Sequence, residues 1–289
     1  VSYEPNSLGG GCPFQAGAAH GFVSAPARVN ARIEEQAKIR AKPEKFADHY
    51  TQATLFYESQ TAAEQAHIAA AFRFELSKVE HLHIRAAMVG HLRHIDEDLA
   101  KRVADGLALG SLPDAPATSA PVQDMAPSPA LQLIGKMRHT LVGRAVGILV
   151  ADGSDGAAIQ AVKKAAIEAG ASVKIVATKV GGVKLASGSH LPADGQLAGT
   201  PSVVFDAVAI LLSEAGAKLL AKEAAAIDFA RDAFGHLKAI GVDAGGQALL
   251  HSAQVEKDAG VIDIKDVKSF IEAAKTRQWK REPSVRTLA

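Results

Sequence analysis

Two short apolar runs decide the fold of this chain. Residues 145–150 read Ala-Val-Gly-Ile-Leu-Val and residues 172–177 read Ser-Val-Lys-Ile-Val-Ala, while residues 157–168 between them have the length and composition of a helix. A strand, a helix and a second strand in this order are typical of a βαβ unit, in which the two strands are parallel. The sequence therefore predicts an α/β domain.

The alternation continues toward the C-terminus. Further apolar runs at residues 202–212 and 239–242 are separated by an Ala-rich helical stretch at 218–230, and a last helix is expected at 266–274 before a basic tail that ends at residue 289. Repeated strands and helices of this kind predict a doubly wound parallel sheet, which we place in residues 131–289.

Before residue 111 the periodicity is helical. Thr61 and Glu64 have the spacing of a capping box, in which the hydroxyl and the carboxylate satisfy backbone N–H groups at the start of a helix. Two apolar stripes with spacings of three and four follow, and they consist of Ile68, Phe72, Leu76 and Val79, then Ile84, Met88, Leu92, Ile95, Leu99 and Val103. Residues 61–110 are therefore predicted to form a helical hairpin.

Two segments lack such a period. Residues 1–60 hold four prolines and scattered apolar side chains, which indicates an extended arm that gains order only by packing on other surfaces. Residues 111–130 are rich in proline, alanine and serine, which is typical of an extended linker. The chain opens on Val1 in a turn-rich stretch, and we expect this start to be the cut edge of a longer polypeptide.

Composition argues against several classes of function. The formal net charge is +1, and binding of nucleic acids or anionic membranes needs clustered Lys and Arg. The sequence has no apolar run of about eighteen residues and no secretory signal. Cys12 is the only cysteine, which rules out an intrachain disulfide and fits a reducing compartment. We expect a cytoplasmic protein with neither nucleic-acid nor membrane partners.

Two stretches resemble a known family. The first is Tyr3-Glu4-Pro5-Asn6-Ser7, and the second runs from Phe46-Ala47-Asp48-His49-Tyr50-Thr51-Gln52-Ala53-Thr54-Leu55-Phe56-Tyr57 through Glu64, His67-Ile68, Phe74-Glu75-Leu76 and Val79-Glu80. They are similar to the region that follows the haem pocket in haem catalases, and the similarity covers most of residues 1–107. In the large-subunit branch of that family (hydroperoxidase II type), a helical segment, a proline-rich linker and a flavodoxin-like domain follow one another, as they do here.

This resemblance implies a function for the full subunit. Family members disproportionate hydrogen peroxide to water and oxygen at a buried haem, using a distal His, a distal Asn and a proximal Tyr that all lie upstream of the segment seen here. The resemblance therefore implies no catalytic, cofactor-binding or metal-binding residue in this chain and no haem in the chain alone. It implies as partners a missing N-terminal catalase core and the other subunits of a homo-tetramer, with the terminal domain in a stabilising and assembly role. His49 and Tyr50 are alternative haem-site residues, but the resemblance places them in the helical region.

The α/β domain resembles the class I glutamine-amidotransferase-like superfamily, whose enzymes carry a cysteine nucleophile on a tight turn between a strand and a helix. Here the turn reads Ala239-Ile240-Gly241-Val242-Asp243-Ala244-Gly245-Gly246-Gln247-Ala248-Leu249-Leu250, with Asp243 at the cysteine position. In the loop 152–156 after the first strand, capping and turn formation is favoured over anion binding. The acid of these enzymes would fall near Ala158, and no His has the expected spacing. We predict a vestigial site made of Asp243, Gly245, Ser154 and Asp155.

Other interpretations differ in class. An acid pair of Asp243 and Asp155 could act in general acid–base catalysis, or Asp243 could serve an active hydrolase or glyoxalase. A group of histidines lies on or near one helix, and we interpret it as surface or interface residues rather than a metal site; its members are His81, His83, His91 and His94. A stand-alone C-terminal fragment would instead act as a holdase-like chaperone that binds unfolded chains through apolar surface, without enzymatic activity.

Overall fold

The computed structural model describes residue 40 and residues 44–286, and residues 1–39, 41–43 and 287–289 lie outside the described part. The expectations for the start of the chain, for Cys12, for most of the arm and for the end of the basic tail concern residues outside it. The chain divides into two units, Val1–Glu44 and Lys45–Ala289, and the second is described below.

The helical segment begins with a short 3₁₀ turn, η1 (Glu44–Ala47), and continues with α1 (Thr51–Glu58), α2 (Ala62–Ser77), α3 (Leu82–Leu92) and α4 (Glu97–Gly106). The predicted capping box is confirmed, because Glu64 N–H donates to Thr61 Oγ1 (3.4 Å) and Thr61 N–H donates to Glu64 Oε2 (2.9 Å). Leu92, Leu99 and Val103 are buried in the core of these helices, and the other stripe residues that pack against it are Ile68, Phe72, Leu76, Met88 and Ile95. Ile84, by contrast, is exposed, so the stripes pack as predicted only in part.

The predicted hairpin is wrong in its helix boundaries. The second stripe is divided between α3 and α4, because Asp96 Oδ1 accepts the N–H of Leu99 (2.6 Å) and starts a new helix. The end of the segment expected to be an extended arm is helical, since α1 occupies Thr51–Glu58. Eight residues are too few for a recognisable period.

The α/β domain contains a six-stranded sheet in the order β5-β2-β1-β6-β7-β8, and the neighbouring strands that pair in it are parallel. The strands are β1 (Ala145–Val150), β2 (Ser172–Ala177), β5 (Gly195–Gln196), β6 (Ala207–Leu211), β7 (Ile240–Val242) and β8 (Val261–Asp263). If the short edge strand β5 is left out and the other five strands of the sheet are renumbered in chain order, their order in the sheet is 2-1-3-4-5, which is the flavodoxin-like order. The predicted fold class is confirmed.

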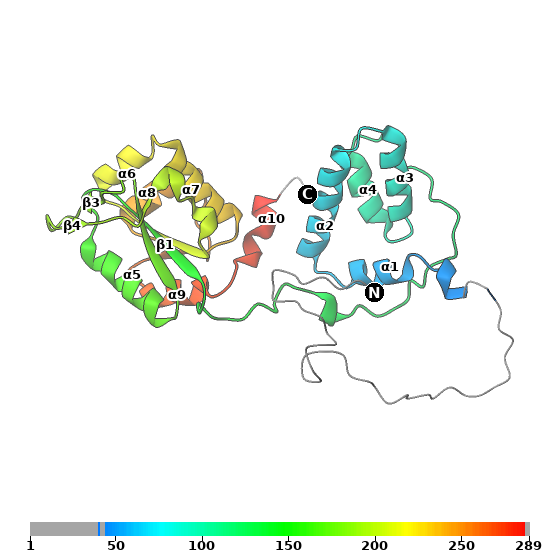
Figure 1. Cartoon of the computed structure of the whole chain (residues 1–289), viewed down its shortest axis with the longest axis horizontal. Coiled ribbons are helices and arrows are strands. Elements are labelled where there is room, and N and C mark those ends of the chain that lie inside the picture. Colours follow the sequence, from blue (N-terminus) through cyan, green and yellow to red (C-terminus); the bar gives the residue numbers. More distant parts are fainter. Residues whose placement is uncertain (1–39, 41–43, 287–289) are drawn as a thin grey trace, which may run out of the picture. The chain divides into compact units, whose positions relative to one another are not determined.

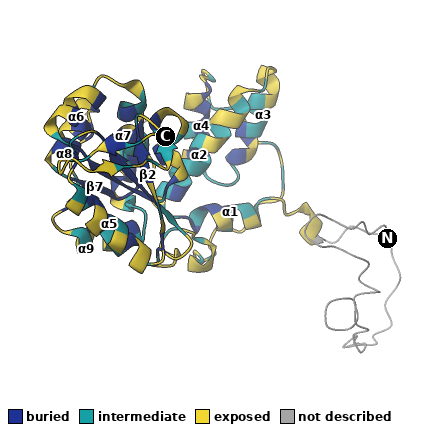
Figure 2. Cartoon of the chain, turned by 60° about the vertical axis from the view of Figure 1, so that its left-hand side comes forward, coloured by how far each residue is buried: buried dark blue, intermediate teal, exposed yellow. Residues whose placement is uncertain are grey.

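Helices cover both faces of this sheet. α6 (Glu214–Leu220), α7 (Ala224–Gly235) and α8 (Ala244–Ser252) lie on one side of β1, and α5 (Gly156–Glu168) and α9 (Val267–Ala274) lie on the other (Figure 1). Each side encloses its own core, centred on Phe229 and Ile210 on one face and on Phe270 and Ile148 on the other. The burial colours of Figure 2 are accordingly darkest along the strands.

Several element boundaries differ from the predictions. The run 202–212 is a 3₁₀ turn, η4 (Ser202–Val204), followed by the strand β6, and the helical stretch 218–230 is interrupted between α6 and α7. The strands β5 and β8 and the small antiparallel hairpin of β3 (Val183–Lys184) and β4 (His190–Leu191) were not predicted. Each contains two or three residues, so it carries no alternation to detect.

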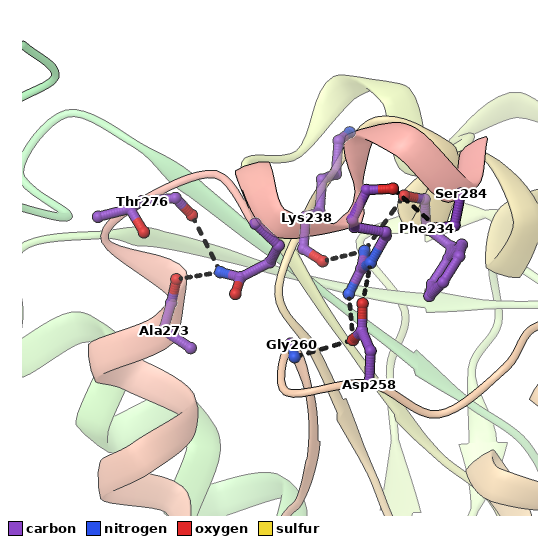
Figure 3. A network of polar contacts seen from close by, with 9 residues as sticks. Phe234, Lys238, Asp258, Gly260, Ala273, Thr276 and Ser284 are labelled. Carbon is purple, nitrogen blue, oxygen red and sulfur yellow. Dashed lines mark hydrogen bonds and ion pairs between the residues drawn. The ribbon is translucent and has the colours of Figure 1, made fainter. Parts of the chain in front are cut away.

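A buried arginine fastens the C-terminal segment, which contains η5 (Trp279–Arg281) and α10 (Glu282–Val285), to the α/β domain. The side chain of Arg281 is fully buried and donates to both carboxylate oxygens of Asp258 (2.6 and 2.8 Å). It also donates to the carbonyl oxygens of Phe234 (3.1 Å) and Lys238 (2.9 Å) and lies over the Phe234 ring (Figure 3).

Among the described residues, none of the helices has the length and apolar character needed to cross a bilayer.

Candidate functional site

Asp243 lies where the superfamily resemblance places a nucleophile, directly after β7 and before α8. Its backbone is extended (φ −93°, ψ −170°), so it lacks the strained turn that projects a nucleophile from the sheet. Asp243 Oδ1 accepts the N–H of Gly246 (2.7 Å) and of Leu212 (3.1 Å). The carboxylate therefore caps α8 and fixes the end of β6 to it.

The surroundings of Asp243 are partly apolar. Burial raises the pKa of Asp243 above its ordinary value, although N–H groups that include those of Gly246 and Leu212 act in the opposite direction. The carboxylate borders two cavities at the carboxyl ends of the strands, one of about 910 Å³ between α6 and α8 and one of about 550 Å³ between α5, α8 and the end of β8. This edge is where open α/β sheets bind ligands.

The glycines of the turn serve helix packing. A Cβ on Gly245 would lie 2.0 Å from the carbonyl oxygen of Leu212, and a Cβ on Gly246 would lie 2.1 Å from that of Ile210. Both residues are therefore needed for α8 to approach β6 closely. Neither glycine has a positive φ, so the prediction that Gly245 belongs to a sharp catalytic-type bend finds no support in its backbone.

Ser154 joins the loops that follow β1 and β6. Its side chain is fully buried, and its Oγ donates to the carbonyl oxygen of Leu211 (2.7 Å) and accepts the N–H of Ala151 (3.0 Å). Ser213 makes a second link, since its Oγ donates to the carbonyl oxygen of Asp152 (2.6 Å). These loops flank the point where the strand order reverses, which is the usual ligand crevice of this fold, and here they are bonded to each other.

The β3–β4 hairpin engages the same loop. Gly153 N–H donates to Lys184 O (2.7 Å), Lys184 N–H donates to Asp152 Oδ1 (2.8 Å), and Ala186 N–H donates to Ser154 O (3.0 Å). Backbone groups of Gly153 and Ser154 at the switch point, which is the point where the strand order reverses, are thus hydrogen-bonded within the domain. Sequence reasoning missed Ser213 and the hairpin, although Ser213 followed by Glu214 carries the signal of a helix start.

Asp155 caps the neighbouring helix. Its Oδ1 accepts the N–H of Ala157 (2.8 Å) at the start of α5, as the capping interpretation predicts. Asp155 and Asp243 border the same cavity of about 550 Å³, together with Ala158 and Gln247. Over residues 44–286 no hydrogen bond between the two carboxylates is seen, and each one is engaged by backbone N–H groups of its own helix.

Several His and Tyr side chains near the helices are hydrogen-bonded to other parts of the chain. Tyr50 Oη and His91 Nδ1 are 2.6 Å apart, and His94 Nε2 donates to the carbonyl oxygen of Pro116 (2.6 Å), so these side chains are engaged within the segment. Tyr57 is buried in the helical core. The two cavities beside Asp243 are lined by no His, Tyr, Cys or Met, the side chains that hold haem iron. These two cavities therefore do not fit a haem.

The clustered histidines form ring contacts with each other and with one tyrosine. The rings of His81 and His83 lie 5.6 Å apart, and those of Tyr50 and His94 lie 4.7 Å apart. In the part of the chain that the structure describes, no three His, Cys, Asp or Glu side chains are arranged to hold a metal ion.

The fold and this site define a flavodoxin-like domain in which Asp243 caps the helix that follows β7. Residues 142–281 match the family described as "C-terminal domain found in long catalases", and residues 43–107 match the family described as "Catalase-related immune-responsive". The chain therefore belongs to the large-subunit catalases and corresponds to their C-terminal portion.

Individual relatives agree with this assignment. The chain is 42% identical over 293 residues to "Catalase C" of Rhizobium meliloti (strain 1021), covering 99% of this chain and 41% of that protein. It is 35% identical to "Catalase HPII" of Pseudomonas putida, covering 100% and 40%, and 33% identical to "Catalase-2" of Bacillus subtilis (strain 168), covering 97% and 40%. The chain thus spans about two fifths of the length of the curated relatives it matches.

Proposed function

We propose that this chain is the C-terminal part of a haem catalase, in which the α/β domain stabilises and assembles the subunit while the upstream core carries the haem and the reaction. The observation that carries the proposal is the bonding at the switch point, where Ser154 and Ser213 tie the β1 and β6 loops together. Hydrogen bonds that fix these two loops to each other suit a structural role, because they stiffen the edge of the sheet where related folds bind ligands.

The reaction assigned to the full subunit converts two hydrogen peroxide molecules into two water molecules and one oxygen molecule. One peroxide loses two electrons and two protons and leaves as oxygen, and the other gains them and its O–O bond breaks. Haem, when bound in the full subunit, supplies the electron transfer. No step of this reaction is assigned to this chain, because the resemblance to the family places the haem-site residues in the upstream core.

The stabilising role is tested with a chimaera. The segment of Rhizobium meliloti "Catalase C" that aligns with residues 45–286 is replaced by this chain's residues, and the control protein lacks the segment. We expect the chimaera to show a Soret band, to evolve oxygen from peroxide, and to form a homo-tetramer that withstands heating better than the truncated control. A truncated control that assembles and withstands heating equally well would contradict the assembly role.

The isolated chain gives a separate test of the assignment. Purified residues 1–289 are expected to show no Soret band when reconstituted with haem and no oxygen evolution from peroxide, because the resemblance places the haem ligands in the upstream core. Haem-dependent oxygen evolution by the isolated chain would contradict the location of the active site in the upstream core.

A second candidate function is the holdase-like chaperone. Large apolar side chains are exposed in the terminal part of the chain, including Leu133 (78%), Val142 (71%) and Val180 (64%). Such side chains could bind unfolded chains if nothing covers them. The isolated chain should then suppress aggregation of a heated client enzyme measured by light scattering. Unchanged scattering at a molar excess of the chain would exclude this function.

A further inference from the structure

The proline-rich residues 113–134, which we call the strap, are bonded along the helical segment rather than free. The sequence predicted an extended linker at 111–130, and apart from the short 3₁₀ turn η2 (Pro129–Leu131) the strap indeed contains no helix or strand. Side chains of α1, α2 and the end of α3 nevertheless bond its backbone at successive positions. Figure 1 shows this part of the chain running alongside α1.

The first set of bonds lies at the end of α3. Arg93 Nη1 donates to the carbonyl oxygen of Pro113 (2.9 Å), and His94 Nε2 donates to that of Pro116 (2.6 Å). Between them, a Cβ on Gly90 would lie 2.5 Å from the carbonyl oxygen of Asp114. Only glycine at position 90 therefore lets the strap lie this close to the helix.

The second set lies at the two ends of α1. Val122 N–H donates to Thr51 Oγ1 (2.9 Å), and Ser128 N–H donates to Ser59 Oγ (2.8 Å). Gln60 Nε2 adds a bond to the carbonyl oxygen of Leu131 (3.3 Å). Because Thr51 begins α1 and Ser59 follows its last residue, these bonds hold the strap parallel to the whole helix.

The third set is a carboxylate that is only 8% exposed. Glu64 Oε1 accepts the N–H of Leu133 (2.6 Å) and of Ile134 (3.0 Å), while its Oε2 completes the capping box with Thr61. Burial alone would raise the pKa of Glu64, but the hydrogen bonds from Thr61, Ile134 and Leu133 lower it to about 2. The carboxylate is thus charged and accepts hydrogen bonds at both of its oxygens.

We propose that the helical segment carries a binding groove for an extended, proline-rich peptide, and that the chain's own residues 113–134 occupy this groove. The hydrogen bonds from Arg93, His94 and the side chains of α1 and α2 go to backbone groups of the strap, so the groove selects an extended backbone rather than particular side chains. Prolines suit such a peptide because they restrict the unbound chain and leave fewer N–H groups that need a partner.

The groove determines how the α/β domain is attached. Since the strap is held as far as Ile134, residues 135–144 are the part that separates the last bond from β1 at Ala145. The chain therefore reaches the domain through a short connection instead of a long flexible linker, and a contact between His67 of α2 and Glu282 of α10 joins the two parts a second time. This inference concerns the chain by itself and does not depend on the proposed catalase role.

The test uses the full chain with a specific protease site inserted between residues 118 and 121, where the strap makes none of the bonds described above. After cleavage, the two fragments are separated by size-exclusion chromatography at micromolar concentration. We expect them to elute together, because the bonds from Thr51, Ser59 and Glu64 lie on the far side of the cut. Fragments of the otherwise unchanged chain that elute separately would overturn the proposal.

Leu133 offers a matched pair of variants. Its side chain is 78% exposed, so Leu133→Ala removes only surface atoms, whereas Leu133→Pro also removes the N–H that Glu64 accepts. The loss of a hydrogen bond to a charged group should make the fragments of the nicked Leu133→Pro chain dissociate about tenfold more readily than those of nicked Leu133→Ala. Equal dissociation of the two variants, with unchanged circular dichroism before cleavage, would show that Glu64 does not hold the strap.

Discussion

Replacing Arg281 with Met is expected to destabilise the α/β domain by about 3 kcal/mol. Arg281 has a fully buried side chain and binds Asp258 through two hydrogen bonds of 2.6 and 2.8 Å. Met has a similar length but no charge or donor. The substitution therefore removes the ion pair and the bonds to Phe234 O and Lys238 O without leaving a large cavity.

The expected loss of unfolding free energy follows from the state of Asp258 once Arg281 is removed. Removing one partner of a buried ion pair costs about 3–5 kcal/mol, because the other charge remains buried without its counterion. Asp258 is 32% exposed at its side chain and keeps the N–H of Gly260 (2.8 Å), so water can compensate part of the loss. These two observations place the expected cost at the lower end of that range.

The measurement is urea unfolding followed by the fluorescence of Trp279, the single tryptophan of the chain, which lies two residues before Arg281. Lys280→Met is the matched control, because Lys280 is exposed on the same turn, and it should change the free energy of unfolding by less than about 0.5 kcal/mol. A free-energy loss for Arg281→Met below about 1 kcal/mol would refute the argument that this arginine fastens the C-terminal segment.

The same variant should alter the response to acid. Burial raises the pKa of Asp258, but the bonds and charge of Arg281 outweigh it and hold the pKa below the ordinary value of 3.8. A lowered folded-state pKa gives stability that is present above the unfolded-state value and is lost as the pH falls below it. The unfolding free energy of Arg281→Met should therefore fall less between pH 5 and about pH 3 than that of the unchanged chain.

Three further outcomes are expected for buried polar groups of the α/β domain. Ser154→Ala should lower the free energy of unfolding by about 1–3 kcal/mol, whereas the exposed Ser187→Ala should not, and equal urea midpoints would contradict the link between the loops. Asp243→Asn keeps the oxygen that caps α8 and removes a partly buried charge, so it should change stability at pH 7 by less than about 1 kcal/mol, and a larger loss would speak for a further role of the charge. Burial, helped by the charge of Arg277, lowers the pKa of Lys238 to about 8. Between pH 8 and 10.5 the folded chain therefore binds fewer protons than the unfolded chain, and the free energy of unfolding should rise by about 1–3 kcal/mol. Lys238→Met should abolish that rise.

The sequence by itself determined the elements whose patterns are long and local. The strands β1 and β2 begin and end where the apolar runs at 145–150 and 172–177 predict, and the Thr61–Glu64 capping box starts α2. These features depend on neighbouring residues, because a buried parallel strand reads as an apolar run and a helix start needs only a hydroxyl and an acid three residues apart. The resemblance to large-subunit catalases also came from local motifs, and the comparisons confirm it.

Only the tertiary structure decided which polar groups meet. Ser154 and Leu211 are 57 residues apart, and Glu64 and Leu133 are 69 residues apart, so no periodicity links them. Their pairing depends on parallel strands ending at one edge of the sheet and on the strap returning along α1. For this reason the sequence predicted an extended linker at 111–130 but not the hydrogen bonds that join the strap to α1 and α2, and it did not predict the bond between Ser154 and Leu211.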